Sequence, residues 1–204
     1  MNNLFNRISL FLLILISTNC FCQRKENIDI TDVTKATFFN PGISYEKRIG
    51  KFQSLFTQLF MNTSFSIGYS DALGNTSSIH FDPAATLQYR YYYNSKNREA
   101  KGKRTEMNSL NYLAFILETT FSKGSISSSY YTEKDRRIIY AFGIAWGFQR
   151  NYAKRFSLDI NFGPGYLYTR VTTMNDTGQL ITKNAGQFIH VGQINLGFWL
   201  NKRN

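Results

Sequence analysis

Hydrophobic and polar side chains alternate along much of the chain with a period of two residues. The clearest run is KRFSLDINFGPGYLY, residues 154–168, in which nearly every second residue is apolar. Successive side chains of a β-strand point to opposite faces, so this period predicts a strand with one apolar and one polar face. The apolar face holds Phe156, Leu158, Ile160, Phe162, Tyr166 and Tyr168, and the polar face begins with Arg155, Ser157, Asp159 and Asn161.

The same period predicts seven further strands, which places the chain in the all-β class. The next clearest is RRIIYAFGIAWGFQ, residues 136–149, and the weakest is VTKATFF, residues 33–39. Most of the predicted strands run 14 residues or more, whereas strands of globular proteins typically have about 5–6 residues. The remaining five cover residues 41–49, 53–69, 79–93, 108–122 and 187–200.

Strand length and the chemistry of the polar face favour a membrane β-barrel over a soluble β-sandwich. A tilted strand needs about 9–11 residues to cross the hydrocarbon of a bilayer. In such a barrel the apolar face meets lipid and the polar face lines the lumen. We therefore expect an eight-stranded antiparallel up-and-down transmembrane β-barrel, with a soluble β-sandwich as the structural alternative.

The charged residues on the polar faces are expected to pair across the lumen. An eight-stranded interior is just wide enough for side chains to fill it, so paired charges would plug it. A narrow gated pore or a small-ligand site is the alternative for the same residues. The predicted lumen charge network consists of Glu46, Arg48, Asp82, Arg90, Glu118, Arg155 and Asp159.

Short and long links alternate between the predicted strands. The links near 50–52 and 150–154 are short, while 70–78, 123–135 and 170–186 are longer and rich in Ser, Gly, Asn and Thr. Such asymmetry is typical of short periplasmic turns and long external loops, although the long link 94–107 falls on the periplasmic side. The long external loops are where a specific function is expected.

Three prolines fall inside predicted strands, where each removes one ladder donor. We expect bulges or bends near the outer rim to accommodate Pro41, Pro83 and Pro164. The segment Gly163-Pro164-Gly165 is the expected bend.

The N-terminus, MNNLFNRISLFLLILISTNCFCQ, has a short basic region, an apolar run and a polar region ending in two cysteines. This build is typical of a secretory signal peptide. The expected organisation is a signal peptide over 1–22, a periplasmic segment over 23–32 and the barrel over 33–204. Cleavage after Cys22 removes both cysteines, which excludes disulfides and thiol chemistry from the mature chain. A short membrane anchor and a lipoprotein acylated on cysteine are the alternatives.

The net charge of +11 permits nucleic-acid binding in principle. Because a secreted protein does not meet DNA, no nucleic-acid partner is expected. The densest basic cluster, KNREAKGKR over 96–104, is expected to be a solvated loop. A contact with lipid phosphates or another envelope polymer is the alternative for this cluster.

No catalytic, cofactor or metal site is predicted. The chain has two histidines, His80 and His190, and neither stands with a serine and an acidic residue in a pattern that indicates a nucleophile and its base. Two histidines without cysteine also make a weak case for a metal. The Tyr and Trp residues are expected at membrane interfaces, where amphipathic rings lie at headgroup level. These interfacial aromatics are Tyr91, Tyr93, Trp146, Tyr166, Tyr168 and Trp199.

Four stretches together resemble the small outer-membrane β-barrels of Gram-negative bacteria, in particular an uncharacterised barrel family common in Bacteroidota. They are NPGISYEKRIGKFQSL, LQYRYYY, GIAWGFQRNYAKRFSLDINFGPGY and QINLGFWL. The resemblance implies a barrel in the cell outer membrane with both termini in the periplasm. Such barrels often end on a terminal aromatic that serves the insertion machinery, whereas here LNKRN follows Phe198 and Trp199.

The function expected from these observations is a structural or surface-interaction role with no catalysis. Its expected partners are outer-membrane lipids including lipopolysaccharide, the barrel-insertion machinery and a possible extracellular ligand bound through the loops. A small-ligand binding or narrow-pore transport protein is the alternative, and a lipid-modifying barrel enzyme is the third reading.

Overall fold

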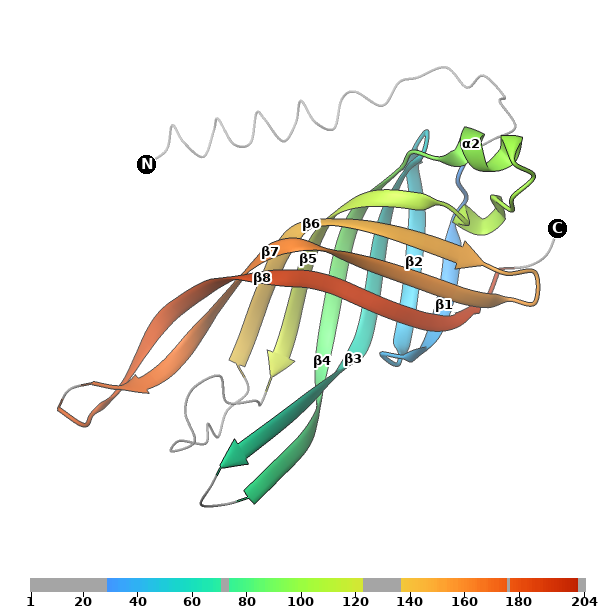
Figure 1. The fold of residues 1–204 in the computed structure, drawn as a ribbon. Coiled ribbons are helices and arrows are strands. Elements are labelled where there is room, and N and C mark those ends of the chain that lie inside the picture. Colours follow the sequence, from blue (N-terminus) through green and yellow to red (C-terminus); the bar gives the residue numbers. More distant parts are fainter. Residues whose placement is uncertain (1–28, 71–73, 123–136, 176, 202–204) are drawn as a thin grey trace, which may run out of the picture.

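The computed structural model describes residues 29–70, 74–122, 137–175 and 177–201 (Figure 1). A short helix, α2 (Ser95–Ala100), and one 3-10 turn, η1 (Glu106–Asn108), lie in the link between the fourth and fifth strands. No helix among the described residues combines the length and the hydropathy that a membrane span requires. The described residues form β1 (Val33–Phe39), β2 (Gly42–Gly50), β3 (Gln53–Ser70), β4 (Gly74–Tyr92), β5 (Asn111–Ser122), β6 (Arg137–Asn151), β7 (Phe156–Met174) and β8 (Leu180–Trp199).

Each strand pairs antiparallel with the next in sequence, and β8 pairs with β1 to close the sheet into a ring. The predicted all-β class and the eight-stranded up-and-down order are confirmed. The weak pattern at 33–39 is indeed a strand, since it pairs with both β2 and β8.

The ring has a large stagger between its first and last strands. Following the register from Lys35 through each neighbouring strand leads to Gln187, which lies twelve residues along β8 from Trp199, the residue that pairs directly with Lys35. For eight strands this stagger corresponds to a strand tilt of roughly 45°. The interior of such a ring can be filled by side chains or can hold one small ligand.

Burial alternates along most of the strand length that closes the ring, with mainly polar side chains inward and apolar side chains outward. On β4, Asp82, Thr86 and Arg90 are at most 4% exposed. Their outward neighbours Phe81 and Tyr89 are 58% and 41% exposed. The ring is therefore largely polar inside, with a smaller apolar cluster, and apolar outside, which is the reverse of a soluble protein.

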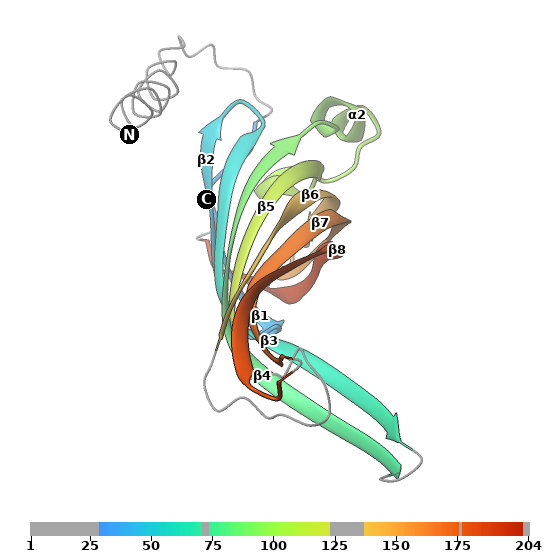
Figure 2. The ribbon, with the colours of Figure 1, turned by 90° about the vertical axis from the view of Figure 1, so that its left-hand side faces the viewer.

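Two hairpins extend beyond the rest of the ring, at the end opposite α2 (Figures 1 and 2). Strands β3 and β4 stay paired as far as Ser70 and Gly74, and β7 and β8 as far as Met174 and Leu180. The prediction of open loops at 70–78 and 170–186 was therefore wrong for the described residues, because backbone pairing continues through these Ser-, Thr- and Asn-rich segments. The predicted loop 123–135 lies outside the described residues.

The three prolines are accommodated without bulges in their strands. Pro41 lies in the turn between β1 and β2, not inside a strand. Pro83 pairs with Met61 of β3 but lies just beyond Ala84, the outermost β4 residue paired with β5. Its missing N–H therefore costs no ladder bond on that side.

Pro164 lies in the middle of β7, so the expected bend near the outer rim was also wrong. The register between β6 and β7 is the same on both sides of Pro164, with pairing interrupted around it. The glycines in this region are explained by the close packing of β6 against β7, and not by a bend. An added Cβ on Gly163 would lie 2.0 Å from the Ile144 carbonyl oxygen, and one on Gly143 would lie 2.5 Å from that of Pro164. These glycines let β6 and β7 approach where the wall curves.

Candidate functional site: the polar interior

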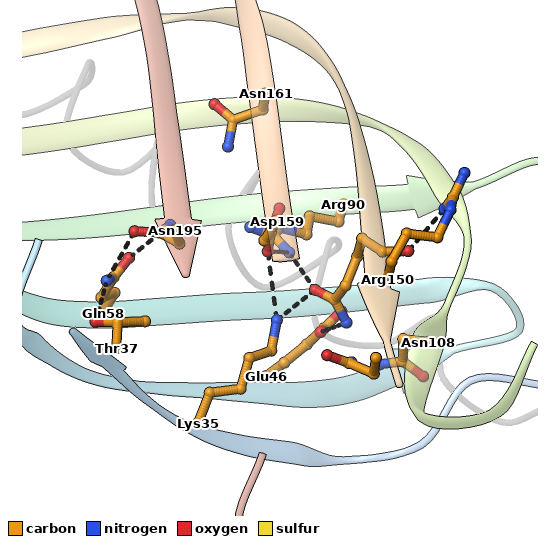
Figure 3. A network of polar contacts seen from close by, with 12 residues as sticks. Lys35, Thr37, Glu46, Gln58, Arg90, Asn108, Arg150, Asp159, Asn161 and Asn195 are labelled. Carbon is orange, nitrogen blue, oxygen red and sulfur yellow. Dashed lines mark hydrogen bonds and ion pairs between the residues drawn. The ribbon is translucent and has the colours of Figure 1, made fainter. Parts of the chain in front are cut away.

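Four charged side chains from four strands meet inside the ring and form what we call the central ionic cluster: Lys35, Glu46, Arg90 and Asp159 (Figure 3). Each is at most 2% exposed. Arg90 donates through Nη1 to Asp159 Oδ2 at 2.8 Å, and Lys35 Nζ donates to the same oxygen at 3.3 Å. Two cations and two carboxylates balance in charge, which is the condition under which buried ions are tolerated.

Gln149 of β6 joins the two halves of this cluster. Its Oε1 accepts hydrogen bonds from Lys35 Nζ at 2.5 Å and from Arg90 Nη1 at 3.0 Å. Its Nε2 donates to Glu46 Oε2 at 3.2 Å. One amide thus connects the cations to the second carboxylate through both of its ends.

Hydroxyl groups satisfy the other carboxylate oxygens. Glu46 Oε1 accepts from Ser54 Oγ at 2.6 Å and from the Tyr92 hydroxyl at 2.5 Å. Asp159 Oδ1 accepts from the Tyr112 hydroxyl at 2.6 Å. Each buried carboxylate therefore has hydrogen-bond donors on both of its oxygens, which offsets the loss of water.

Aromatic rings hold the Arg90 guanidinium in place. Its central carbon lies 3.8 Å from the centroid of Phe56 and 4.3 Å from that of Tyr112. Cation–π contacts of this kind strengthen when the cation is removed from water. Arg90 is thus held by charge, by hydrogen bonds and by stacking at one level of the interior.

Amide side chains form a second polar layer, which lies farther from α2 than the central ionic cluster does. Gln58 and Asn195 exchange two hydrogen bonds, at 3.3 and 3.2 Å. Gln88 Nε2 donates to Gln193 Oε1 at 3.1 Å, and Gln193 Nε2 donates to Glu118 Oε2 at 3.0 Å. The predicted network residue Glu118 thus meets an amide, and among the described residues it has no ion-pair partner.

The predicted lumen residues divide into three groups in the structure. Glu46, Arg90 and Asp159 come together in the central ionic cluster. Glu118 lies in the amide layer, and Asp82 lies farther out, where it accepts a hydrogen bond from Ser122 Oγ at 2.8 Å. The expected single network is therefore spread over several levels of the interior.

Arg48 and Arg155 were wrongly placed in the lumen. Arg48 shares the inward parity of Glu46 but lies near the end of β2, where its side chain is 50% exposed and pairs with Asp29. Arg155 lies in the turn before β7, with φ of +68°, so the parity of the strand does not govern its side chain. Its guanidinium lies 5.4 Å from the centroid of the Trp199 ring.

The predicted lumen charge network left out several buried polar side chains, among them Lys35, Gln149, Tyr92 and Tyr112. Lys35 lies on the weakest predicted strand. Its charge, at a position of inward parity, was the feature that could have identified it. Tyr92 and Tyr112 are aromatic, so their inward hydroxyls do not stand out in a pattern of apolar and polar residues. Parity relative to Arg90 on β4 and to Glu118 on β5 would have placed both rings inside.

A short segment before β1, the N-terminal strap (residues 29–32), covers the end of the ring that carries α2. Ile30 is buried, and the Thr31 N–H donates to Asn108 Oδ1 at 2.8 Å. Asp32 accepts from Lys47 Nζ and from the Arg48 N–H, both at 2.8 Å. Partial burial raises the pKa of Asp32, but these hydrogen bonds outweigh it, so the pKa lies below its ordinary value.

The predicted interfacial aromatics face outward, with one exception. Tyr91, Tyr93, Trp146 and Tyr168 are exposed, and Trp146 Nε1 donates to the Tyr93 hydroxyl at 2.7 Å. Tyr166 is half-buried, and its ring meets that of Phe142 at a tilt and that of Phe188 edge to face.

Trp199 was wrongly assigned to an interface. It is 1% exposed and points inward at the end of β8. There its Nε1 donates to the Tyr152 carbonyl oxygen at 2.9 Å. Its position in β8 has the inward parity of Asn195 and Gly197, so its size and apolar character were misleading.

The histidines and the basic segment form no reactive site in the described residues. His190 faces outward and stacks on Phe162, with ring centroids 5.0 Å apart, while the side chain of His80 lies outside the described part. No group of three or more metal-ligating side chains occurs in the part of the chain that the structure describes. The basic segment 96–104, expected as a loop, contains α2, where Arg98 donates to the Arg104 carbonyl oxygen at 3.1 Å.

Comparisons of the chain with protein-family models, with curated proteins and with solved structures give no match.

Proposed function

We propose that the chain is an integral outer-membrane β-barrel with a structural or surface-interaction role, secreted through its N-terminal signal peptide. The observation that carries this proposal is the outward face of the ring. Large hydrophobic side chains are exposed on all eight strands, among them Phe38, Ile43, Leu59, Leu87, Phe115, Ile144, Phe162 and Ile194.

Water is an unfavourable solvent for such a surface. Soluble monomers rarely expose contiguous apolar patches larger than a few hundred Å². Among the residues whose side chains the structure describes, twenty-nine large hydrophobic ones are exposed. Hydrocarbon is a favourable environment for them, and the pairing of β8 with β1 closes the ring at the level where these two strands meet, as lipid requires. The Tyr and Trp residues near the strand ends, such as Tyr91, Trp146 and Tyr168, suit the two interfaces.

The interior supports a structural role over transport. At the level of the central ionic cluster the inward side chains have almost no exposure, and the N-terminal strap lies across the same end of the ring. A plug of paired charges beneath a covered mouth opposes the passage of ions at this level of the described interior. The hairpins β3–β4 and β7–β8 project at the other end, where they are suited to meet partners outside the cell.

The test is heat-modifiable migration of the full chain in outer-membrane fractions. A folded barrel resists the detergent of the gel until it is boiled, so unboiled and boiled samples should run at different positions. The protein should also stay in the membrane pellet after a carbonate wash. Release of all the protein by carbonate, with no shift on boiling, would contradict membrane insertion.

A further inference from the structure

The wall of the ring is lower at β1 and β2 than elsewhere. β1 reaches only to Phe39, the partner of Leu196 on β8, and β2 only to Gly42, the partner of Phe60 on β3. β3 continues for ten residues beyond Phe60, and β8 for sixteen residues beyond Leu196. Within the described residues no strand pairs with β3 or β8 on these facing edges, and we call this place the side gap.

The side gap opens inside the apolar band of the outer surface. Lys47 is an exposed cation on the outward face of β2, which places it at headgroup level. The β1–β2 turn ends at Gly42, five residues along β2 from Lys47. At a tilt of about 45° this is roughly 12 Å of height, whereas the apolar band of a membrane barrel is about 25 Å tall. The wall at β1 and β2 therefore ends near the middle of the band.

Backbone groups on both edges of the side gap point into it. The Met61 N–H donates to the Pro41 carbonyl oxygen, so the odd-numbered residues of β3 from Thr63 onward also direct their N–H and C=O groups to this side. The Leu200 N–H donates to the Thr34 carbonyl oxygen, so the even-numbered residues of β8 do the same. Hydrocarbon offers these groups no hydrogen bond, and leaving them unpaired there is strongly unfavourable.

The interior behind the side gap is polar at the same level. The inward Ala141 and Leu167 are only half-buried there, so this level is packed more loosely than the level of Arg90. Hydrocarbon that entered would meet buried polar groups and would leave the strand edges unpaired. A β-strand, which supplies backbone N–H and C=O groups, is the element that closes such an edge. The buried polar side chains at this level are Asp82, Thr120, Ser122, Arg137 and Thr169.

His190 independently indicates a protein contact at this place. It lies on the outward face of β8, where it is exposed and stacks on Phe162. Its outward neighbours Ile194 and Phe188 are large and apolar, so it lies within the apolar band. Ionisable side chains at membrane depth are rarely directed at lipid and usually lie against protein. The edge of β8 thus has both backbone groups and a side chain suited to a polypeptide partner.

We propose that the side gap is an interface between two copies of this chain, in which β8 of each copy pairs with β3 of the other. The proposal rests on the proposed function, since only insertion removes water from these edges. β3 runs away from the end with α2 and β8 runs toward it. The two edges are therefore antiparallel when both copies have the same orientation in the membrane, as all neighbouring strands of the ring are.

A second copy satisfies more of the edge than a single bound peptide does. A twofold axis along the membrane normal makes the β8–β3 contact twice, so both edges of both copies are paired. One peptide strand added to β8 would leave the edge of β3 open. The hairpins β3–β4 and β7–β8 point apart (Figures 1 and 2), which gives a partner access to each edge from outside the ring.

Equal depth of the two copies in the bilayer fixes the register of this pairing. At a tilt of about 45°, each residue changes height by about 2.3 Å and each step to a neighbouring strand by about 3.4 Å. Applied to the register of the ring, these steps place the partner's His190 opposite Thr63. Both residues direct their backbone groups into the side gap, so they form a hydrogen-bonded pair with Cα atoms about 5.5 Å apart.

Disulfide formation between copies tests this register. The variant is Thr63→Cys with His190→Cys, in the full chain with Cys20→Ser and Cys22→Ser, folded into phosphatidylcholine vesicles and exposed to a mild oxidant. Within one copy the two positions are three strand spacings apart, roughly 14 Å, which is too far for a disulfide. We expect a covalent dimer on a non-reducing gel, from a protein that also shifts on boiling under reducing conditions.

A second cysteine pair controls for collisions between copies. Phe115→Cys with Ile138→Cys places both thiols on outward positions of β5 and β6, on the wall opposite the side gap, and should stay monomeric. Equal crosslinking of the two pairs, or no dimer from the first pair, would overturn the interface. If the heat-dependent shift persists in that case, membrane insertion still stands. Loss of the shift in the cysteine-free parent would instead overturn the proposed function.

A proline substitution tests the backbone pairing without a covalent bond. His190→Pro removes an N–H that faces the side gap and leaves the pairing of β8 with β7 intact, whereas His190→Ala keeps this N–H. Donor- and acceptor-labelled copies, each labelled at Lys96→Cys in the cysteine-free parent, report association by energy transfer in vesicles. Transfer should persist in His190→Ala and be lost in His190→Pro, with both variants still heat-modifiable. Equal transfer in the two variants would contradict strand pairing at this edge.

Discussion

At the scale of single residues, charge balance governs what the interior tolerates. Asp159 meets two cations, Arg90 and Lys35, on one oxygen. Glu46 meets two hydroxyls and an amide. Removing one member of such a set leaves a buried charge without its partner, which costs more than removing a balanced pair.

Arg90→Met should therefore lower the free energy of unfolding by about 3–5 kcal/mol. Asp159→Asn should also lower the free energy of unfolding, because it leaves two buried cations without their shared carboxylate. The double variant should lower the free energy of unfolding by less than the sum of the two single variants, since the two partners are coupled. The measurement is urea unfolding in lipid vesicles, followed by tryptophan fluorescence.

The exposed cation Lys96 of α2 provides the control. Lys96→Met should change the free energy of unfolding by less than about 0.5 kcal/mol. Strict additivity of the Arg90 and Asp159 variants would contradict the coupling between these residues.

Glycine geometry gives a second prediction at this scale. Gly163→Ala should destabilise the ring by about 2 kcal/mol or more, because its Cβ would lie 2.0 Å from a backbone carbonyl oxygen of β6, which cannot move cheaply. At Gly50 an added Cβ would meet only the flexible end of Gln53, at 3.3 Å. Gly50→Ala should therefore be nearly neutral in the same unfolding assay, and equal effects of the two substitutions would refute the packing argument.

At the scale of elements, the sequence predicted strands better than it predicted their ends. Period-two alternation located all eight strands, because each strand has one face toward a distinct environment. The extended hairpins were missed because polar, turn-favouring residues at 70–78 and 170–186 resemble a loop when only composition is considered. Parity also failed at Arg48. This residue lies near the end of β2, where a side chain of inward parity reaches solvent.

The N-terminal strap gives a prediction about pH. The pKa of Asp32 is depressed in the folded state. The contribution of this carboxylate to stability is therefore present above the unfolded pKa of about 3.9, and it is lost as pH falls through the lower folded pKa. At the start of β1, next to the strap, the Thr34 N–H donates to Asn201 Oδ1 at 2.9 Å. Hydrogen exchange of the Thr31 and Thr34 amides should accelerate below about pH 4, relative to amides in β5. Asp32→Asn should show fast exchange of these amides even at neutral pH. An unchanged exchange profile in Asp32→Asn would show that this carboxylate does not hold the strap.

At the scale of the whole molecule, two opposite demands are met at the two ends of one ring. The end with α2 is filled by the central ionic cluster, held by side chains from β1, β2, β4, β6 and β7, so five strands are tied together across the interior. The other end has a lower wall, a looser interior and projecting hairpins. This division confines rigidity to one end and leaves the other able to meet lipids or partners.

The division predicts that the wild-type ring does not conduct. Reconstituted in planar bilayers, it should give no conductance steps, because Arg90, Gln149 and Glu46 leave no exposed path at their level. Arg90→Ala should also stay closed, since Lys35 and Tyr112 still occupy that level and the N-terminal strap covers the mouth. An open porin in the same bilayers shows that a pore would be detected. Discrete steps in the wild type would instead mean that the cluster opens, and the transport reading would then replace the structural one.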